Sequence, residues 1–385
     1  MLAGSWSEVS ELDSDLRAEL GRRLQSAREV AGLTRSQADE ALAVGPGWAE
    51  IFESGAFTAS LDAVLAMLSL YDADPRTFFD SLGRPDAGIY RLLNAEQDGG
   101  DLVISWPYGD HDARYRLVGA TEAEWRDVLD VMRDGFAAND LSGAVVRSFH
   151  RAMALWPHAN PSDIWYFVIA QGFVDPFNHP ARDARRDWSQ SWKRTGGWAL
   201  ERVLVAHYET FLFQHGITIA ILPKPQIATM MQLAGLGPEA IPDKADVILY
   251  GTYRETNSLL GVVHVKASFA ERRTDDVPMS RALIQAGFFS PLWTLDGKAH
   301  PSPEPVNSGE LGGVLTPGQV DGRSEKRKDF EVQGSFSACF SYNTRTLPTP
   351  IGQAGVAAPI VVCDFSNPND AFSRAVIAAW HAKYP

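Results

Sequence analysis

The sequence predicts an α/β protein in which a small all-α domain precedes a larger core, a central mixed sheet flanked by helices. Three observations predict this. Leucines recur at helical spacing between residues 13 and 83, with capping residues between the helices. Beyond about residue 145, short runs rich in β-branched residues alternate with helical patterns. The 385 residues, 45% of them hydrophobic and 22% charged, suffice for two or three domains with their own cores.

Composition and charge exclude several classes of protein. No apolar run reaches the roughly 18 residues of a membrane span, and the acidic start lacks a signal-peptide pattern, so we expect a cytoplasmic protein with no membrane partner. The only cysteines, Cys339 and Cys363, are too few for a disulfide framework or a cysteine zinc site. The 35 basic and 48 acidic residues give a net charge of −13. This excludes a uniformly basic nucleic-acid-binding surface but not a local basic cleft.

Three domains are expected, with boundaries at residues 1–85, 86–145 and 146–385. The first is expected to contain five helices. Gly32 ends the first helix, and Thr34 and Ser60 are N-caps of the second and the fourth. Residues 45–47 break the chain before the third helix, and Pro75 begins the fifth. The second is a connector with a hairpin over 101–118 and a helix that starts at Thr121 in a capping box with Glu124.

The third domain carries the α/β pattern. We expect its elements in this order: a long helix over 196–214, strands at 217–222, 246–250 and 259–267, a helix at 277–286, a surface loop at 296–325, strands at 331–342 and 358–364, and a last helix at 370–382.

The first domain resembles the Cro/C1-type helix-turn-helix family. The resemblance rests on Leu20-Gly21-x-x-Leu24, Arg28, Gly32-Leu33-Thr34, Ala38, Ile51 and Glu53-x-Gly55. In that family the third helix reads base edges in the major groove. Here this helix offers Trp48, Glu50 and Glu53, but none of the side chains that usually pair with guanine or adenine. Carboxylates repel phosphates, so DNA contact and a partner-docking role are both open for this domain.

The most informative stretch for chemistry is residues 241–276. Asp246 opens one β-branched run, turn residues follow, and a second run ends at Lys266. An antiparallel hairpin would bring these two side chains together at one sheet edge. A carboxylate beside a lysine suits metal-assisted phosphodiester hydrolysis, in which the acid holds Mg²⁺ and the lysine positions water and offsets charge. Asp243 is the rival to Asp246, which we prefer because the strand begins directly after it.

One carboxylate rarely suffices for Mg²⁺. Asp275 and Asp276, just past the lysine, are candidates for the second. Glu201 is a third candidate, because it heads an apolar stripe on the long helix, where an acid is costly unless it binds a cation. The rival interpretation is that the helix starts at Thr195 and Glu201 merely complements the helix dipole in its first turn.

The hairpin, the lysine and the flanking carboxylates resemble the PD-(D/E)xK nuclease fold. More narrowly, VHVKASFAERRTDDVPMSRALIQAGFFSPLWTLD, with a likeness that runs from about residue 150 to the end, resembles the BsaWI/AgeI-like type II restriction endonucleases. That family cleaves within CCGG-centred palindromes, and the resemblance implies Mg²⁺-dependent cleavage of double-stranded DNA by a homodimer or higher homo-oligomer.

The resemblance also implies roles for single residues. Asp246 matches the metal-binding aspartate, Lys266 the catalytic lysine and Glu201 the helix glutamate. The acid that the standard motif places two residues before the lysine is His264 here, and the CCGG-cutting group supplies it from downstream, which indicates Asp276. Relatives would carry glutamate at that place, and the side chain of an aspartate is shorter. Asp275 is therefore the alternative to Asp276.

Glu271 and Arg272 resemble the pair with which the family reads CCGG, and their chemistry fits, since a carboxylate accepts from cytosine and a guanidinium donates to guanine. Arg273 is the neighbouring candidate for DNA contact. Two basic clusters are candidates for contact with the DNA backbone. The first cluster consists of Arg182, Arg185, Arg186, Lys193 and Arg194, of which the last three are the residues expected to contact the backbone. The second consists of Arg323, Lys326, Arg327 and Lys328.

The leading hypothesis is a type II site-specific deoxyribonuclease with a helix-turn-helix domain, whose host would be protected by a cognate DNA methyltransferase. The alternative is a helix-turn-helix transcription regulator with a non-enzymatic carboxy-terminal domain. A third possibility is a nuclease whose first domain recognises the site or its modification state.

Overall fold

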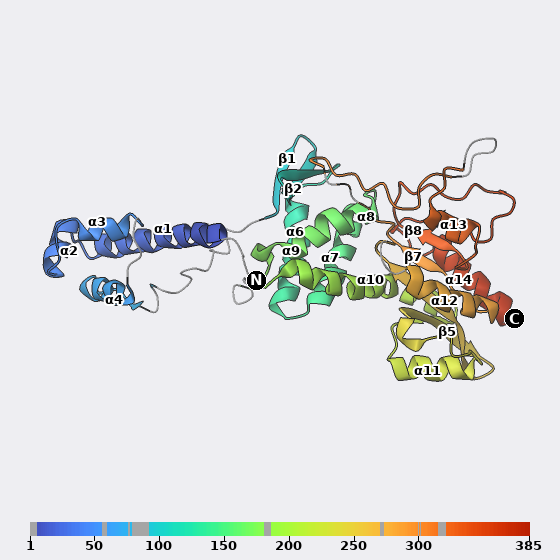
Figure 1. Cartoon of the computed structure of the whole chain (residues 1–385). Coiled ribbons are helices and arrows are strands. Elements are labelled where there is room, and N and C mark those ends of the chain that lie inside the picture. Colours follow the sequence, from blue (N-terminus) through green and yellow to red (C-terminus); the bar gives the residue numbers. More distant parts are fainter. Residues whose placement is uncertain are drawn as a thin grey trace. The chain divides into compact units, whose positions relative to one another are not determined.

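The structure is a computed structural model that describes residues 6–55, 60–75, 78, 92–180, 186–269, 273–298, 300, 302–314 and 321–385. The chain divides into two compact units, Met1–Tyr90 and Arg91–Pro385, and each is described by itself (Figure 1). Within the described ranges, no helix combines the length and the apolar character needed to pass through a bilayer.

The first unit is a set of short helices that follow one long helix. Its elements are α1 (Trp6–Val30), α2 (Arg35–Ala41), α3 (Trp48–Glu53) and α4 (Leu61–Leu70). The expected boundaries are confirmed, because Gly32 follows α1 with a φ of 71°, Thr34 and Gln37 form a capping box at α2, and Ser60 caps α4. The helix expected after Pro75 falls largely outside the described residues.

Glu53, at the end of α3, is buried inside this unit. Its carboxylate accepts hydrogen bonds from Arg28 at 2.6 and 3.0 Å and from Arg35 at 2.9 Å. The expectation that Glu53 stands on the outer face of the third helix is therefore wrong, because two guanidinium groups neutralise it in the interior. Glu50 is exposed on the same helix and remains an acidic group of the face that would meet a partner.

Replacing Glu53 by glutamine should destabilise the first unit by about 3–5 kcal/mol, because Arg28 would stay buried without its counter-charge. The matched control on the same helix is Glu50→Gln, which should change the free energy of unfolding by less than about 0.5 kcal/mol. Hydrogen exchange of peptides from residues 17–55 in the full chain measures both effects. Equal protection in the two variants would contradict the structural role of Glu53.

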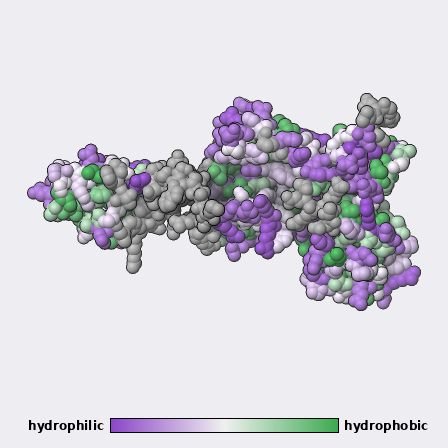
Figure 2. Space-filling model, in the orientation of Figure 1, coloured by the Kyte–Doolittle hydropathy of each residue, from purple (hydrophilic) through white to green (hydrophobic). Residues whose placement is uncertain are grey.

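The second unit begins with a three-stranded antiparallel sheet of β1 (Asn94–Asp98), β2 (Asp101–Tyr108) and β3 (His111–Leu117). The predicted hairpin is present as β2 and β3, and β1 was not expected. Most of β1 is exposed, and Figure 2 shows hydrophilic residues gathered over this sheet. The other face contributes Leu102, Ile104 and Trp106 to the main core of the unit. The segment expected as a connector thus shares one hydrophobic core with the chain that follows it.

A helical layer follows. Thr121 and Glu124 form the expected capping box at α6 (Glu122–Ala137). Further helices are α7 (Leu141–Leu155), α8 (Pro161–Asp163), a π-helix η1 (Ile164–Ile169), α9 (Ala170–Val174) and the 3-10 turn η2 (Pro176–Asn178).

The long helix α10 (Trp188–Phe213) starts earlier than expected. Asp187 caps it by accepting from the backbone N–H of Gln190, so Thr195 lies buried inside the helix and not at its start. The helix continues through Gly196, which packs against the ring of Trp192 one turn earlier, where a side chain would have little room. Glu201 is consequently a mid-helix residue, and the interpretation that it complements the dipole of a first turn is wrong.

The central sheet has six strands in sequence order: β4 (Ile217–Ala220), β5 (Val247–Tyr253), β6 (Thr256–Lys266), β7 (Leu292–Thr294), β8 (Cys339–Ser341) and β9 (Ile360–Val362). The first three pair antiparallel and the last four parallel, which gives the predicted mixed sheet. The helices around it are α10, α11 (Lys224–Leu233), α12 (Arg273–Gln285), α13 (Glu325–Glu331) and α14 (Ala371–Lys383), and the 3-10 turn η4 (Pro242–Lys244) precedes β5.

Alternate residues of β6 face two different cores. Val263 and Val265 join a core with residues of α10 and α14, whereas Leu259 and Val262 join a core with residues of α11 and α12. Helices therefore cover both faces of the sheet (Figure 1).

Residues 331–342 do not form the single strand that we expected. They contain the end of α13 and the short strand β8. Ser324 caps α13, and Arg327 pairs with Glu331 one turn further on at 2.7 Å, so local helix signals prevail over the apolar run. The expected surface loop at 296–325 is partly interior, since Asn307 and Leu311 are buried.

Two partly buried histidines lie beside the main core. His150 of α7 and His207 of α10 have ring centroids 6.2 Å apart, and Phe365 stacks on His207 at 3.9 Å. Burial lowers the pKa of His207 to about 3 and also lowers the pKa of His150. Both rings are therefore neutral at pH 7.

The protein should lose stability in mild acid because of His207. Its folded pKa is depressed, so the stabilisation is complete above the ordinary histidine pKa of about 6.5 and is lost as the pH falls below it, where only the unfolded chain takes up the proton. At pH 5 the loss from this residue is about 2 kcal/mol. Urea unfolding at pH 7.5 and pH 5 should show a smaller loss for His207→Phe than for the wild type. The exposed His215 provides the control, and a pH dependence in His207→Phe as large as in His215→Phe would contradict the expectation.

Candidate active site

The β5–β6 hairpin brings Asp246 and Lys266 together at one edge of the sheet. Asp246 directly precedes β5, Lys266 is the last residue of β6, and Val247 pairs with Val263 across the two strands. The carboxylate Oδ2 of Asp246 accepts from the Lys266 Nζ at 2.8 Å and from the backbone N–H of Val265 at 2.9 Å. The proximity expected from the strand ends is confirmed, and it is Asp246 that makes this ion pair.

A second carboxylate reaches the same ammonium from a helix. Asp276 lies near the start of α12, and its Oδ2 stands 3.1 Å from the Lys266 Nζ. The side chain of Asp275, the alternative, lies outside the part of the chain that the structure describes. One lysine thus holds two acids, one from a strand end and one from a helix.

The cluster is largely shielded from water. The side chains of Lys266, Asp246 and Asp276 are 13%, 18% and 8% exposed. Burial acts to lower the pKa of Lys266, but the charges and hydrogen bonds of the two aspartates outweigh it, so its pKa stands above the ordinary value. Lys266 therefore carries a full positive charge at neutral pH.

The donor set of this cluster fits a hard divalent cation. Mg²⁺ prefers carboxylate oxygens and usually keeps several waters, so it needs only one or two protein carboxylates. Among the described residues, no three His, Cys, Asp or Glu side chains stand close enough to hold one ion. Glu201 is half-buried on α10 and does not join Asp246 and Asp276 in a single three-acid group.

The predicted recognition and backbone-contact residues are placed only in part. Glu271 and Arg272 lie outside the described residues, and Arg273 is known only as the first residue of α12. On the first basic cluster, Lys193 is exposed on α10, Arg194 stacks on Trp198 at 4.4 Å, and Arg186 stacks on Trp188 at 4.9 Å.

The second basic cluster is paired internally and does not form a free cationic surface. Arg327 is fully buried between Glu331 and the backbone carbonyls of Leu311 and Leu347. The other members pair with carboxylates: Arg323 with Asp321 and Glu331, Lys326 with Glu310 and Lys328 with Glu325. The expectation that Arg327 tracks a phosphate backbone is wrong, because its charge is used to join α13 to the loop before it.

Sequence reasoning missed a buried acid beside the cluster. Asp329 of α13 is 4% exposed and lines a small cavity of about 20 Å³ together with Lys266, Asp276 and Phe336. No helix was expected here, because Asp329 falls between the loop expected to end at residue 325 and the strand expected to begin at residue 331, and it is α13 that turns its side chain inward.

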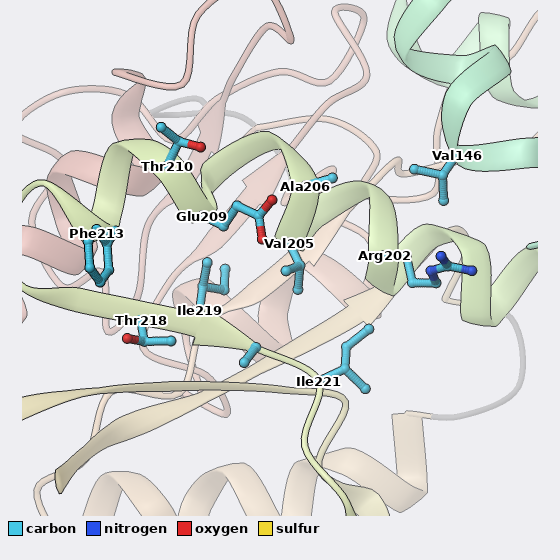
Figure 3. A pocket seen from close by; sticks show the side chains of 11 residues that line it. Val146, Arg202, Val205, Ala206, Glu209, Thr210, Phe213, Thr218, Ile219 and Ile221 are labelled. Carbon is cyan, nitrogen blue, oxygen red and sulfur yellow. The ribbon is translucent and has the colours of Figure 1, made fainter. Parts of the chain in front are cut away.

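A larger groove lies elsewhere, between α10 and the edge strand β4. It has a volume of about 700 Å³, and its lining is mostly apolar, with Val205, Phe213 and Ile221 beside Arg202 and Glu209 (Figure 3). No residue of the Lys266 cluster lines it. The chemistry-bearing groups and this groove are therefore separate features.

Parts of this chain resemble known proteins in sequence and in structure. A helix-turn-helix domain family matches residues 19–78. The type II restriction enzyme AgeI of Thalassovita gelatinovora is 38% identical over 247 residues, which are 61% of this chain and 83% of the relative. A crystal structure of a specific AgeI–DNA complex matches with a TM-score of 0.63 and 32% identity, over 72% of this chain and 99% of that chain. A structure of a pre-specific BsaWI–DNA complex gives a TM-score of 0.32 at 15% identity.

The match to AgeI spans nearly the whole length of that protein, and the fold of the second unit is the one that the resemblance implied. The chain thus belongs to the family of AgeI-like type II restriction enzymes, and it carries a helix-turn-helix domain at its amino-terminal end.

Proposed function

We propose that the protein is a Mg²⁺-dependent restriction endonuclease that cleaves double-stranded DNA at palindromic sites with a CCGG core. The observation that carries the proposal is the cluster of Asp246, Lys266 and Asp276 in a chain of the AgeI-like family. Two acids and a charged amine at one sheet edge are the groups that phosphodiester hydrolysis needs.

The residues of the cluster would divide the work. Asp246 and Asp276 would hold Mg²⁺, which, when bound, polarises the scissile phosphate and lowers the pKa of water. Lys266 would donate hydrogen bonds to the attacking water and offset the charge that builds on the phosphate oxygens. Because the two aspartates already hold its Nζ, the ammonium is in place before the substrate arrives.

Further residues extend the proposal to DNA recognition. Glu201 would add a carboxylate from α10 to metal binding in the complex with DNA. Glu271 and Arg272 would read the CCGG core, Arg273 would contact the DNA beside it, and the cationic residues at the start of α10 would contact the backbone: Arg186, Lys193 and Arg194. A palindrome presents the same contacts twice, so a homodimer or higher homo-oligomer is the matching assembly. A cognate DNA methyltransferase would protect the host.

The experiment is digestion of plasmid DNA with the purified protein in Mg²⁺, followed by sequencing of the ends. Expected are cuts at sites that share a CCGG core, no cuts after removal of the metal, and protection by methylation of the core cytosines. Sedimentation with and without DNA would measure the assembly. An absence of cleavage in both Mg²⁺ and Mn²⁺ would refute the enzymatic proposal.

The helix-turn-helix domain favours a second candidate function, the regulation of transcription. Specific duplex binding that is lost on removal of residues 1–90, together with no nuclease activity, would favour it.

A further inference from the structure

Three buried side chains connect the strand that carries Lys266 to the helix that carries Asp276. His264 Nε2 lies 3.1 Å from the hydroxyl of Ser290, and that hydroxyl lies 2.8 Å from the hydroxyl of Ser280. All three residues are 0% exposed. None of them belongs to the charged cluster itself.

The hydrogen bonds have one consistent direction. His264 Nδ1 has no hydrogen-bond partner in the described structure, and a buried lone pair without a partner costs less than a buried N–H without one. The proton therefore sits on Nε2, and burial lowers the pKa of His264 to about 4, which keeps the ring neutral. His264 Nε2–H then donates to Ser290, Ser290 donates to Ser280, and Ser280 donates to the carbonyl of Ser290 at 3.4 Å.

The chain of hydrogen bonds is fixed at its middle. The backbone N–H of Ser290 donates to the hydroxyl of Ser337 at 2.9 Å, and the backbone N–H of Ser337 donates to the carbonyl of Ser290 at 2.8 Å. Ser290 precedes β7, and Ser337 precedes β8. These backbone hydrogen bonds hold Ser290 rigidly in the sheet. The hydroxyl of Ser290 is thereby fixed in the position where it meets Ser280 of α12.

The positions of the two ends relate this network to the active cluster. His264 stands two residues before Lys266, so both side chains lie on the face of β6 that α12 covers. Ser280 follows Asp276 by four residues, so the two share one face of α12. The network therefore joins α12 to the sheet beside the cluster, and in this arrangement Asp276 Oδ2 lies 3.1 Å from Lys266 Nζ.

We propose that His264, Ser290 and Ser280 are positioning residues, which hold α12 in the register that brings Asp276 to Lys266. The inference rests on the proposed function in one respect, the assignment of Asp276 to the metal. His264 occupies the sequence position at which the standard motif of the wider nuclease fold has an acid. In this chain the residue at that position would instead help to place Asp276, the acid that α12 supplies.

The test compares Ser280→Ala and His264→Leu with the wild type. Both variants should raise the Mg²⁺ concentration for half-maximal cleavage roughly tenfold, the lower end of the effect of residues that orient metal ligands. Calorimetric titration of Mg²⁺ in the absence of DNA should show the same weakening. His264→Gln, whose amide N–H can still reach Ser290, should restore most of the affinity.

A matched control separates positioning from general stability. Ser373 is also fully buried and donates to the carbonyl of Asp370, but it lies on α14. Ser373→Ala should lower the thermal midpoint about as much as Ser280→Ala and leave the Mg²⁺ dependence unchanged.

The proposal is overturned if Ser280→Ala lowers the midpoint without weakening Mg²⁺, or if His264→Gln behaves like His264→Leu. If one variant does not fold, Ser290→Ala tests the same step. Failure of the proposed function looks different, because the wild type would then not cleave at all. If only the assignment of Asp276 to the metal is wrong, Asp276→Asn would cleave with the Mg²⁺ dependence of the wild type.

Discussion

Replacing Lys266 by alanine is expected to lower the rate of DNA cleavage by about 100- to 1000-fold, the usual effect of removing one group that stabilises developing charge. The ammonium is fully charged, since the aspartates raise its pKa, and two carboxylates hold it in a shielded site. Water that replaced it could fill the space but could not supply a fixed positive charge. Single-turnover cleavage of a duplex with one site measures the loss.

The same substitution has a second consequence in the absence of metal. Asp246 and Asp276 would face each other without the cation that now lies between them, so the free energy of unfolding should fall and Mg²⁺ should restore part of it. The matched control is Lys328→Ala, because Lys328 also pairs with an acid, Glu325, but on the solvent side of α13. Cleavage by Lys328→Ala should equal that of the wild type. Cleavage by Lys266→Ala within about threefold of the wild type would exclude Lys266 from the reaction.

The Asp246–Lys266 pair was predictable because it depends on local pattern alone. Two β-branched runs separated by turn residues fix an antiparallel hairpin, and the ends of its strands meet at one edge. Their position just past Lys266 made Asp275 and Asp276 both candidates for the second acid. Only the family resemblance favoured Asp276, because the approach of either side chain to Lys266 depends on where α12 packs. That packing is set by residues far apart in the sequence, such as Ser280 and Ser337.

Elements with weak local signals were the ones missed. The strand β7 was not expected, and β8 occupies only the end of the strand expected at 331–342. Each has three residues, too few to show an alternating pattern, and each pairs with neighbouring strands of the sheet on both sides. The start of α10 was misplaced because Thr195 is a residue type that often begins a helix, whereas Asp187 caps this helix and Thr195 lies inside it.

The first unit shows the same division between pattern and packing. Its helices and caps follow from local residues, and the match over residues 19–78 confirms a helix-turn-helix domain. The interior position of Glu53 does not follow from the sequence, because an acid at the end of a short helix reads as exposed until Arg28 and Arg35 are seen around it. The AgeI structure is matched over 99% of its length by 72% of this chain, so this chain carries residues for which that structure has no counterpart.

Replacing Asp246 by asparagine should be at least as damaging as the loss of Lys266, with cleavage reduced by about 1000-fold or more. Asparagine has nearly the same shape, and its carbonyl oxygen can still accept from the backbone N–H of Val265, which is 2.9 Å away in the wild type. The fold should therefore persist. What is lost is the negative charge, and with it both the ion pair to Lys266 at 2.8 Å and a charged oxygen ligand for the metal.

Two measurements separate these consequences. Calorimetric titration of Mg²⁺ should show weaker binding to Asp246→Asn, because only Asp276 would remain as a charged ligand in the cluster. Binding to a duplex without metal should be equal to or tighter than that of the wild type, because one negative charge near the phosphates has been removed. The matched control is Asp243→Asn, three residues earlier in the 3-10 turn before β5, which should cleave normally. A loss of cleavage in Asp243→Asn that equalled the loss in Asp246→Asn would contradict the assignment of Asp246 as the metal-binding aspartate at the start of β5.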